Sequence, residues 1–190
     1  MMKKHIDQVI GFVVLVLIAV VARLWFRDIP NFAPVAAVAL FAGYVFRSGV
    51  LATTVPLTIL LITDQIIGGY EPMVMFAVYG SLTAPVLLRP MLRRHLRLDG
   101  SRSPVGEVSA LVVCALCASV LFFGVTNLAV WATWYKAQPD MLVPCFIQAV
   151  PFFRFTMFGD LCFASILFGG YAFVAHTVRQ RKNVLASTSA

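Results

Sequence analysis

Asp64, Asn127 and Asp160 are polar residues that stand inside long apolar runs or at their ends. If those runs lie in a membrane, each polar side chain must face water, a ligand or a polar partner, because an unpaired one is costly in lipid. Carboxylates and amides can form directional hydrogen bonds with a small polar solute. These three residues are therefore the first candidates for a binding site.

The best local pattern lies in the apolar run that Pro104 opens. Four of its residues follow one another at intervals of four: Ser119, Phe123, Asn127 and Trp131. This spacing places them on one face of a helix. A hydroxyl, a ring, an amide and an indole in one line can form the wall of a pocket. The alternative is a contact between two helices in which the polar members form hydrogen bonds across the interface.

Asp160 has two candidate ion-pair partners. Arg154 precedes it by about one and a half helical turns, and Arg23 can approach it from another predicted helix. A structural ion pair and a wet cavity are both compatible with a carboxylate at this depth. Asp64 lies near the end of its run, where a solvated helix end is the alternative to a binding role. With Asn31, which opens the second run, the expected ligand-binding residues are Asn31, Asp64, Ser119, Phe123, Asn127, Trp131, Arg154 and Asp160.

Catalysis and metal binding find little support in the sequence. The chain has no HExxH, GxSxG or Gly-rich phosphate loop, and its three histidines are far apart. Cys114 and Cys117 form a CxxC motif inside an apolar run, without a second pair of ligands. We interpret them as small packing residues rather than a metal or redox site. We expect no enzyme activity, no cofactor and no bound metal.

The composition places these polar residues in a membrane protein. Of 190 residues, 61% are hydrophobic and 12% are charged, with a mean hydropathy of +0.90. Soluble domains carry about 45–50% apolar and about 25% charged residues. A bilayer can surround the excess apolar surface. The net charge of +7 is concentrated in short clusters between apolar runs, which argues against nucleic-acid binding.

The sequence predicts an all-α fold, a polytopic membrane helix bundle with about six transmembrane helices. The apolar runs cover residues 6–24, 32–46, 50–67, 72–88, 104–131 and 154–178. They form one transmembrane domain, residues 1–182, and residues 183–190 are expected to be a disordered cytoplasmic tail. The first run is long for a signal peptide, so we expect it to be retained; cleavage after Ala22 is the alternative.

The segment 141–153 is the hardest to assign. It is apolar but too short to span a bilayer, and Pro151 interrupts it. Because a proline removes a helical hydrogen bond, we expect the segment to lie at the membrane interface or to re-enter against protein. The alternative is one long bent helix from Val143 onward.

Basic residues are distributed unevenly between the predicted loops. With the N-terminus inside, the outer side holds only four of them: Arg23, Arg27, Lys136 and Arg154. The inner side holds eleven: Lys3, Lys4, Arg47, Arg89, Arg93, Arg94, Arg97, Arg102, Arg179, Arg181 and Lys182. The positive-inside rule therefore predicts a cytoplasmic N-terminus and C-terminus. The basic loop around Arg93 is a topology anchor, or alternatively a contact with anionic lipid or a cytoplasmic partner.

Four segments resemble the signature blocks of an uncharacterised bacterial membrane-protein family: residues 30–43, 63–64, 119–131 and 151–160. That family in turn resembles the substrate-capture (S) components of energy-coupling-factor vitamin transporters. The resemblance implies a six-helix bundle in the bacterial inner membrane, with a vitamin-like solute near its outer face. It also implies docking on a transmembrane coupling subunit through small residues at AxxxA spacing. Two pairs match that spacing here: Ala33 with Ala37, and Ala39 with Gly43.

The expected function is that of a small-solute binding or transport subunit with an outward-facing site. The expected partners are the lipid bilayer, a small organic solute and a coupling subunit, and no nucleic acid. The alternative is a structural or assembly subunit of a larger membrane complex. In that case, contacts between helices would use all the polar residues, and no cavity would remain.

Reporter fusions test the predicted topology. A reporter fused after Arg97 or after Lys182 should lie in the cytoplasm, and one fused after Gly69 should lie outside, because basic loops remain inside. The activity of a paired periplasmic and cytoplasmic reporter measures each position. A cytoplasmic signal from the fusion after Gly69 would contradict the six-helix topology.

Overall fold

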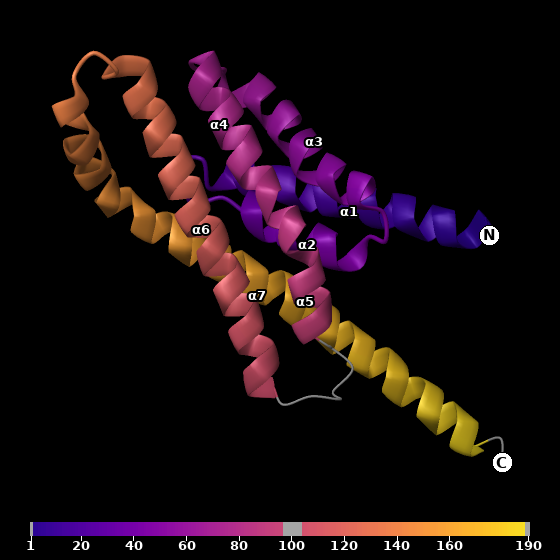
Figure 1. Ribbon diagram of the computed structural model, residues 1–190. Helices are drawn as coiled ribbons and strands as arrows, with labels where there is room; N and C mark the ends of the chain where they lie inside the picture. Colours follow the sequence, from indigo (N-terminus) through magenta and orange to yellow (C-terminus); the bar gives the residue numbers. More distant parts are fainter. Residues whose placement is uncertain (1, 97–103, 189–190) are drawn as a thin grey trace.

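The structure, a computed structural model, describes residues 2–96 and 104–188, and its regular elements there are all helical (Figure 1). They are α1 (Met2–Trp25), α2 (Val35–Val45), α3 (Gly49–Ile67), α4 (Pro72–Thr83), the 3-10 helix η1 (Ala84–Leu88), α5 (Arg89–His95), α6 (Pro104–Trp134), the 3-10 helix η2 (Pro139–Met141) and α7 (Leu142–Thr188). The prediction of an all-α bundle is confirmed.

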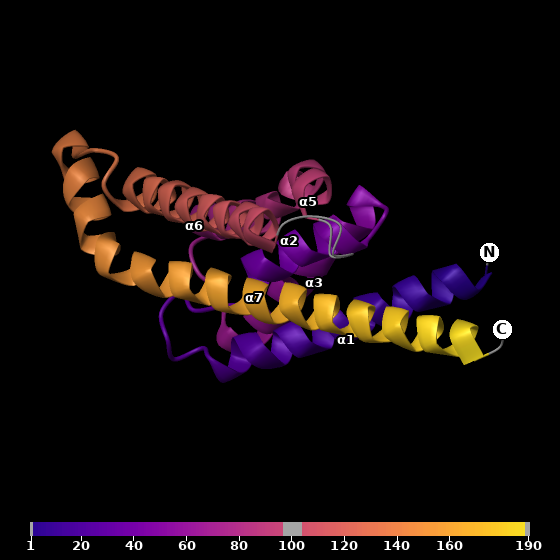
Figure 2. The ribbon, with the colours of Figure 1, turned by 90° about the horizontal axis from the view of Figure 1, so that it is seen from below.

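Five helical stretches of the described chain are long and apolar enough to cross a membrane. They lie in α1, in α3, in the continuous stretch from α4 to α5, in α6, and in α7 together with η2. The protein is therefore a multi-pass membrane protein. Figures 1 and 2 show the N-terminal end of α1 and the C-terminal end of α7 on the same side of the molecule, away from the connection between α6 and α7.

The sixth apolar helix, α2, lies in the centre of the bundle. Its 11 residues extend about 16 Å at 1.5 Å per residue, about half the thickness of the hydrocarbon layer. Eight of them are buried, and α2 packs against α3, η1 and α7. A helix that is apolar on all sides is expected to be enclosed by other helices.

The burial of α2 argues against the predicted partner-docking surface. Ala37 and Ala39 have no exposed surface, and Gly43 is also buried. A Cβ atom added at Gly43 would lie 3.2 Å from the carbonyl oxygen of Val86 in η1. The small residues allow the helices of this chain to approach one another, so they are not available to a coupling subunit. Ala33, just before α2, is half-buried and lines a cavity described below.

Two arginines from the basic stretch hold the C-terminal end of α2. Arg89 Nη2 donates a hydrogen bond of 2.6 Å to the carbonyl of Arg47. Arg93 Nε donates one of 3.1 Å to the carbonyl of Tyr44, and its Nη2 donates another to the carbonyl of Phe46. Carbonyls at the end of a helix lack intrahelical partners, and cations there also complement the helix dipole. Arg89 and Arg93 therefore tie α5 to the turn between α2 and α3.

Met141 ends η2 and residues 142–153 belong to α7, so the favoured prediction of an interfacial or re-entrant piece is wrong. The alternative, one long bent helix, describes the structure, and Figure 2 shows the bend in the orange part of α7. Phe146 and Phe153 lie on either side of Pro151, and both rings pack against Phe123 of α6, with centroids 5.7 and 4.8 Å away. These contacts hold the helix against α6 on both sides of the proline, which offsets the hydrogen bond that Pro151 cannot make.

The last helix is also longer than expected at its other end. α7 continues to Thr188, so residues 183–188 of the predicted disordered tail are helical. Residues 189–190 of that tail lie outside the described residues.

The arginine contacts predict a specific loss of stability. Arg93→Ala should lower the free energy of unfolding by about 2 kcal/mol, because charge-assisted hydrogen bonds to the end of α2 are lost. Arg94→Ala, one position along α5 and exposed, is the matched control and should change it by less than about 0.5 kcal/mol. Chemical unfolding in micelles measures both. Equal losses would show that the contacts of Arg93 add nothing to stability.

Candidate functional site

A cavity of about 300 Å³ lies at the end of α1 that is remote from the N-terminus. We call it the polar cavity. Its walls come from α1, the connection between α1 and α2, the C-terminal end of α3, the connection that follows it, α4, α6 and α7. Six polar side chains line it: Arg23, Arg27, Asn31, Tyr70, Thr156 and Asp160. Three phenylalanines add apolar surface: Phe26, Phe32 and Phe122.

Asp160 is the buried carboxylate of this cavity, with 3% of its surface exposed. Ser119 of α6 donates a hydrogen bond of 2.6 Å to Asp160 Oδ2. The adjacent Gly159 lets α7 approach the segment before α2, since a Cβ atom there would lie 3.2 Å from the ring of Phe32. In the described part of the chain, Asp160 forms no ion pair. Neither Arg154 nor Arg23 is therefore its partner.

Asp64 forms an ion pair with Arg23 and is not solvated by water. Arg23 Nη1 lies 2.8 Å from Asp64 Oδ1, with 14% and 3% of the two side chains exposed. Arg23 also donates to the hydroxyl of Thr63, which itself donates to the carbonyl of Ile59 at 2.7 Å. The interpretation of Asp64 as a solvated helix end is wrong, because the carboxylate is buried against α1. Arg23 lines the polar cavity, and Asp64 lies behind it.

Two tyrosines complete the surroundings of Asp64. The Tyr79 hydroxyl and Asp64 Oδ2 are buried, and neither has a hydrogen-bond partner among the described residues, although the two groups are close enough to interact. Tyr70 lies in the connection between α3 and α4. Its partial burial, followed by the negative charge of Asp64, raises its pKa to about 12, and Arg23 acts in the opposite direction. The Tyr70 phenol is thus a neutral hydrogen-bond donor at physiological pH.

The side chains of three residues on the predicted α6 face contact α7 or the segment that precedes it, and that of the fourth, Asn127, bonds within α6. Ser119 and Phe123 form the contacts with Asp160 and the two rings described above. Asn127 Nδ2 donates to the carbonyl of Phe123 at 2.7 Å, and Trp131 Nε1 donates to the carbonyl of Gln138 at 3.4 Å. This face therefore contributes to helix packing, and its amide group is already engaged within α6.

A second cavity, of about 230 Å³, adjoins the polar cavity. The two share four lining residues: Asn31, Val78, Phe122 and Thr156. Phe123 and Asn127 line only the second cavity. Asn31 adopts a φ of 58°, a left-handed conformation that asparagine tolerates better than most residues. The structure therefore brings four of the predicted site residues, Asn31, Phe123, Asn127 and Asp160, to two adjacent cavities.

Of the other four predicted site residues, Asp64 and Ser119 form the contacts described above without lining either cavity, and Arg154 and Trp131 lie elsewhere. Arg154 is exposed, with its guanidinium carbon 4.7 Å from the centroid of the Phe155 ring. Trp131 lines neither of the two cavities. Sequence reasoning missed Thr156 and Tyr70 as lining residues. Thr156 had a usable signal, because it precedes Asp160 by one helical turn and shares its face.

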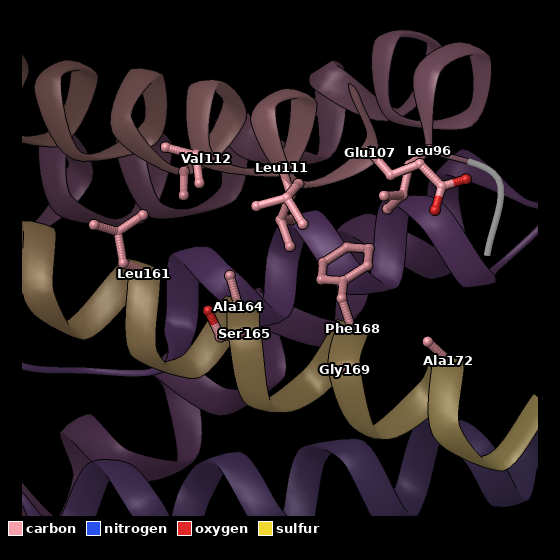
Figure 3. Close-up of a pocket in the computed structure, with 12 residues that line it drawn as sticks. Leu96, Glu107, Leu111, Val112, Leu161, Ala164, Ser165, Phe168, Gly169 and Ala172 are labelled. Carbon is pink, nitrogen blue, oxygen red and sulfur yellow. The ribbon is translucent and has the colours of Figure 1, made fainter. Parts of the chain in front are cut away.

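A third cavity, of about 330 Å³, lies between α6 and α7. Figure 3 shows Leu111 and Val112 pointing toward Leu161, Ala164 and Phe168, with the Glu107 carboxylate at one edge. Its lining is largely aliphatic and contains none of the predicted site residues. Nor do the described residues contain a group of histidine, cysteine or acidic side chains that could hold a metal ion.

The chain belongs to a family of unknown function, DUF6580, whose family model matches residues 3–183. The expected membership of an uncharacterised family is confirmed. A search of the curated proteins and a search of the solved structures found no match. None of the comparisons connects the family with S components.

The buried ion pair predicts a large effect from removing one partner. Asp64→Asn should lower the free energy of unfolding by about 3 kcal/mol, because it leaves the Arg23 guanidinium buried without a counter-charge. Asp28→Asn is the matched control, since the Asp28 side chain is 91% exposed and lies 3.8 Å from Arg27; it should cost less than about 1 kcal/mol.

The double variant Arg23→Met, Asp64→Leu separates the pair from its two members. It should be more stable than Asp64→Asn, because no unpaired charge remains. Chemical unfolding in micelles measures all the variants. Similar losses for Asp64→Asn and Asp28→Asn would contradict a buried ion pair.

Proposed function

We propose that this protein binds a small solute in the polar cavity, as a transporter-type binding subunit of the bacterial inner membrane. The observation that carries the proposal is the convergence of a buried carboxylate, an arginine, an amide and a phenol on one cavity of about 300 Å³. That volume lies at the lower end of the range for small-molecule sites. Apolar walls with a few convergent polar groups are typical of such sites.

A structural or assembly subunit is the competing function, and some contacts favour it. The Arg23–Asp64 ion pair and the hydrogen bond from Ser119 to Asp160 use polar groups within the bundle. A purely structural role, however, gives no reason for a cavity beside Asp160. The polar cavity and its neighbour therefore favour a binding function.

In the proposed orientation, the polar cavity opens toward the outside of the cell. Arg23 lies near the C-terminal end of α1, so the polar cavity is remote from the N-terminus. The basic residues of the loops favour a cytoplasmic position for both termini. Together these features direct the cavity toward the outer face, where a capture subunit meets its solute.

The resemblance to S components is part of this proposal only as a layout of six helices around a small-solute site. Docking through the small residues of α2 is excluded from it, because that helix is enclosed. A coupling partner would have to use another surface.

Filling the cavity tests the proposal. Val78 is half-buried and lines both adjacent cavities, so Val78→Phe should occlude them. A panel of small amines, carboxylates, zwitterions, sugars and nucleosides is added to the purified protein in micelles, and its unfolding temperature is measured. At least one class should raise that temperature for the wild type and not for Val78→Phe, because a ligand stabilises the state that binds it.

Met73→Phe is the matched control, since Met73 is half exposed on the same helix and lines neither cavity. It should respond to solutes as the wild type does. A panel in which no solute distinguishes the wild type from Val78→Phe would contradict the proposed function.

A further inference from the structure

The charged side chains around the polar cavity differ in whether they have a partner of opposite charge. Arg23 already has a carboxylate partner in Asp64 at 2.8 Å. Arg27 is 58% exposed in its side chain and lies beside Asp28 at 3.8 Å. Asp160 is 3% exposed, and in the described part of the chain it has no cationic partner. Among the described residues, Asp160 is therefore the buried acidic group of the cavity that has no cationic partner.

The hydrogen bond from Ser119 does not remove this requirement. A neutral hydroxyl stabilises one carboxylate oxygen but brings no positive charge. The N-terminal end of α2 contributes a partial positive charge nearby, since Gly159 packs against Ala33. A buried carboxylate is most favourable with a full cation at hydrogen-bond distance.

Aromatic rings line the same cavity as this carboxylate. Phe26 and Phe32 both line it and are packed edge to face, with ring centroids 5.2 Å apart. Phe122 adds a third ring from α6. Ring faces attract organic cations, and they exclude the water that would otherwise hydrate an ammonium group. A carboxylate together with several rings is a suitable environment for an organic ammonium ion.

On this basis, and given the proposed solute-binding function, we propose that the solute is a small organic amine whose ammonium group pairs with Asp160. The solute's apolar part lies against Phe26, Phe32 and Phe122. Arg23 and Arg27 retain their own carboxylate partners, so the site does not require an anionic group on the solute. No covalent step is involved.

Three probes of similar size and different charge test this inference on the purified full-length protein: benzylammonium, benzyl alcohol and benzoate. Benzylammonium should raise the unfolding temperature of the wild type in a saturable manner, and the neutral and anionic probes should raise it much less. Asp160→Asn should weaken benzylammonium binding by about tenfold or more. Asp140→Asn removes the same charge at an exposed position in η2 and should bind as the wild type does.

Val78→Phe should also lose the response to benzylammonium, which separates binding in the cavity from partition into the micelle. If Asp160→Asn does not fold, the preference of the wild type among the three probes still decides the question. Preference for benzoate or benzyl alcohol, lost in Val78→Phe, would overturn the amine inference and leave the solute-binding function intact. Unchanged benzylammonium binding in Asp160→Asn, or no response to benzylammonium, would also overturn it. The wider solute panel then decides the function separately.

Discussion

The short helix α2 cannot cross a bilayer, so both of its polar ends must be accommodated inside the protein. At its C-terminal end, Arg89 and Arg93 donate to the carbonyls of the turn that follows. Its N-terminal end has no side-chain cap and begins beside the polar cavity. The other helices enclose its apolar surface. The polar cavity therefore lies at the N-terminal end of α2, which is enclosed within the bundle.

Two carboxylates near that end of the bundle are accommodated in different ways. Asp64 has a guanidinium partner from α1, which joins two helices that are distant in the sequence. Asp160 accepts a hydrogen bond from the Ser119 hydroxyl of α6 and otherwise faces the cavity. A buried ion pair contributes little net stability but is costly to break. In our proposal, Asp64 therefore has a structural role, and Asp160 is available to a ligand.

The sequence was sufficient for the class of fold because lipid imposes strict limits on length and composition. The apolar runs predicted α1, α3 and α6 closely. The course of residues 141–153 was not predictable, because local propensity at Pro151 is overridden by the contacts of Phe146 and Phe153 with Phe123. The role of α2 was also missed, since small residues at a fixed spacing suit an internal contact as well as an external one.

The candidate site was predictable only in part. Because polar groups are costly in lipid, Asp64, Asn127 and Asp160 were identified as residues that must face water, a ligand or a polar partner. It did not identify their partners, because Arg23 approaches Asp64 from a helix 41 positions away in sequence. Helix periodicity identified the residues that share one face of α6. It could not show whether they pack against another helix or line a cavity. Tyr70 lies in a connection without periodicity, so no sequence pattern marked it.

The central claim is that a water-accessible cavity opens at the end of the bundle opposite the two termini. The most direct measurement is cysteine labelling in intact cells, with the four native cysteines replaced by alanine. Val78→Cys in the cavity should react with a membrane-impermeant thiol reagent added outside. Val120→Cys, 57% exposed on the apolar surface of α6, should not react, because lipid covers it. A Val78→Cys variant that does not react from outside would contradict the claim.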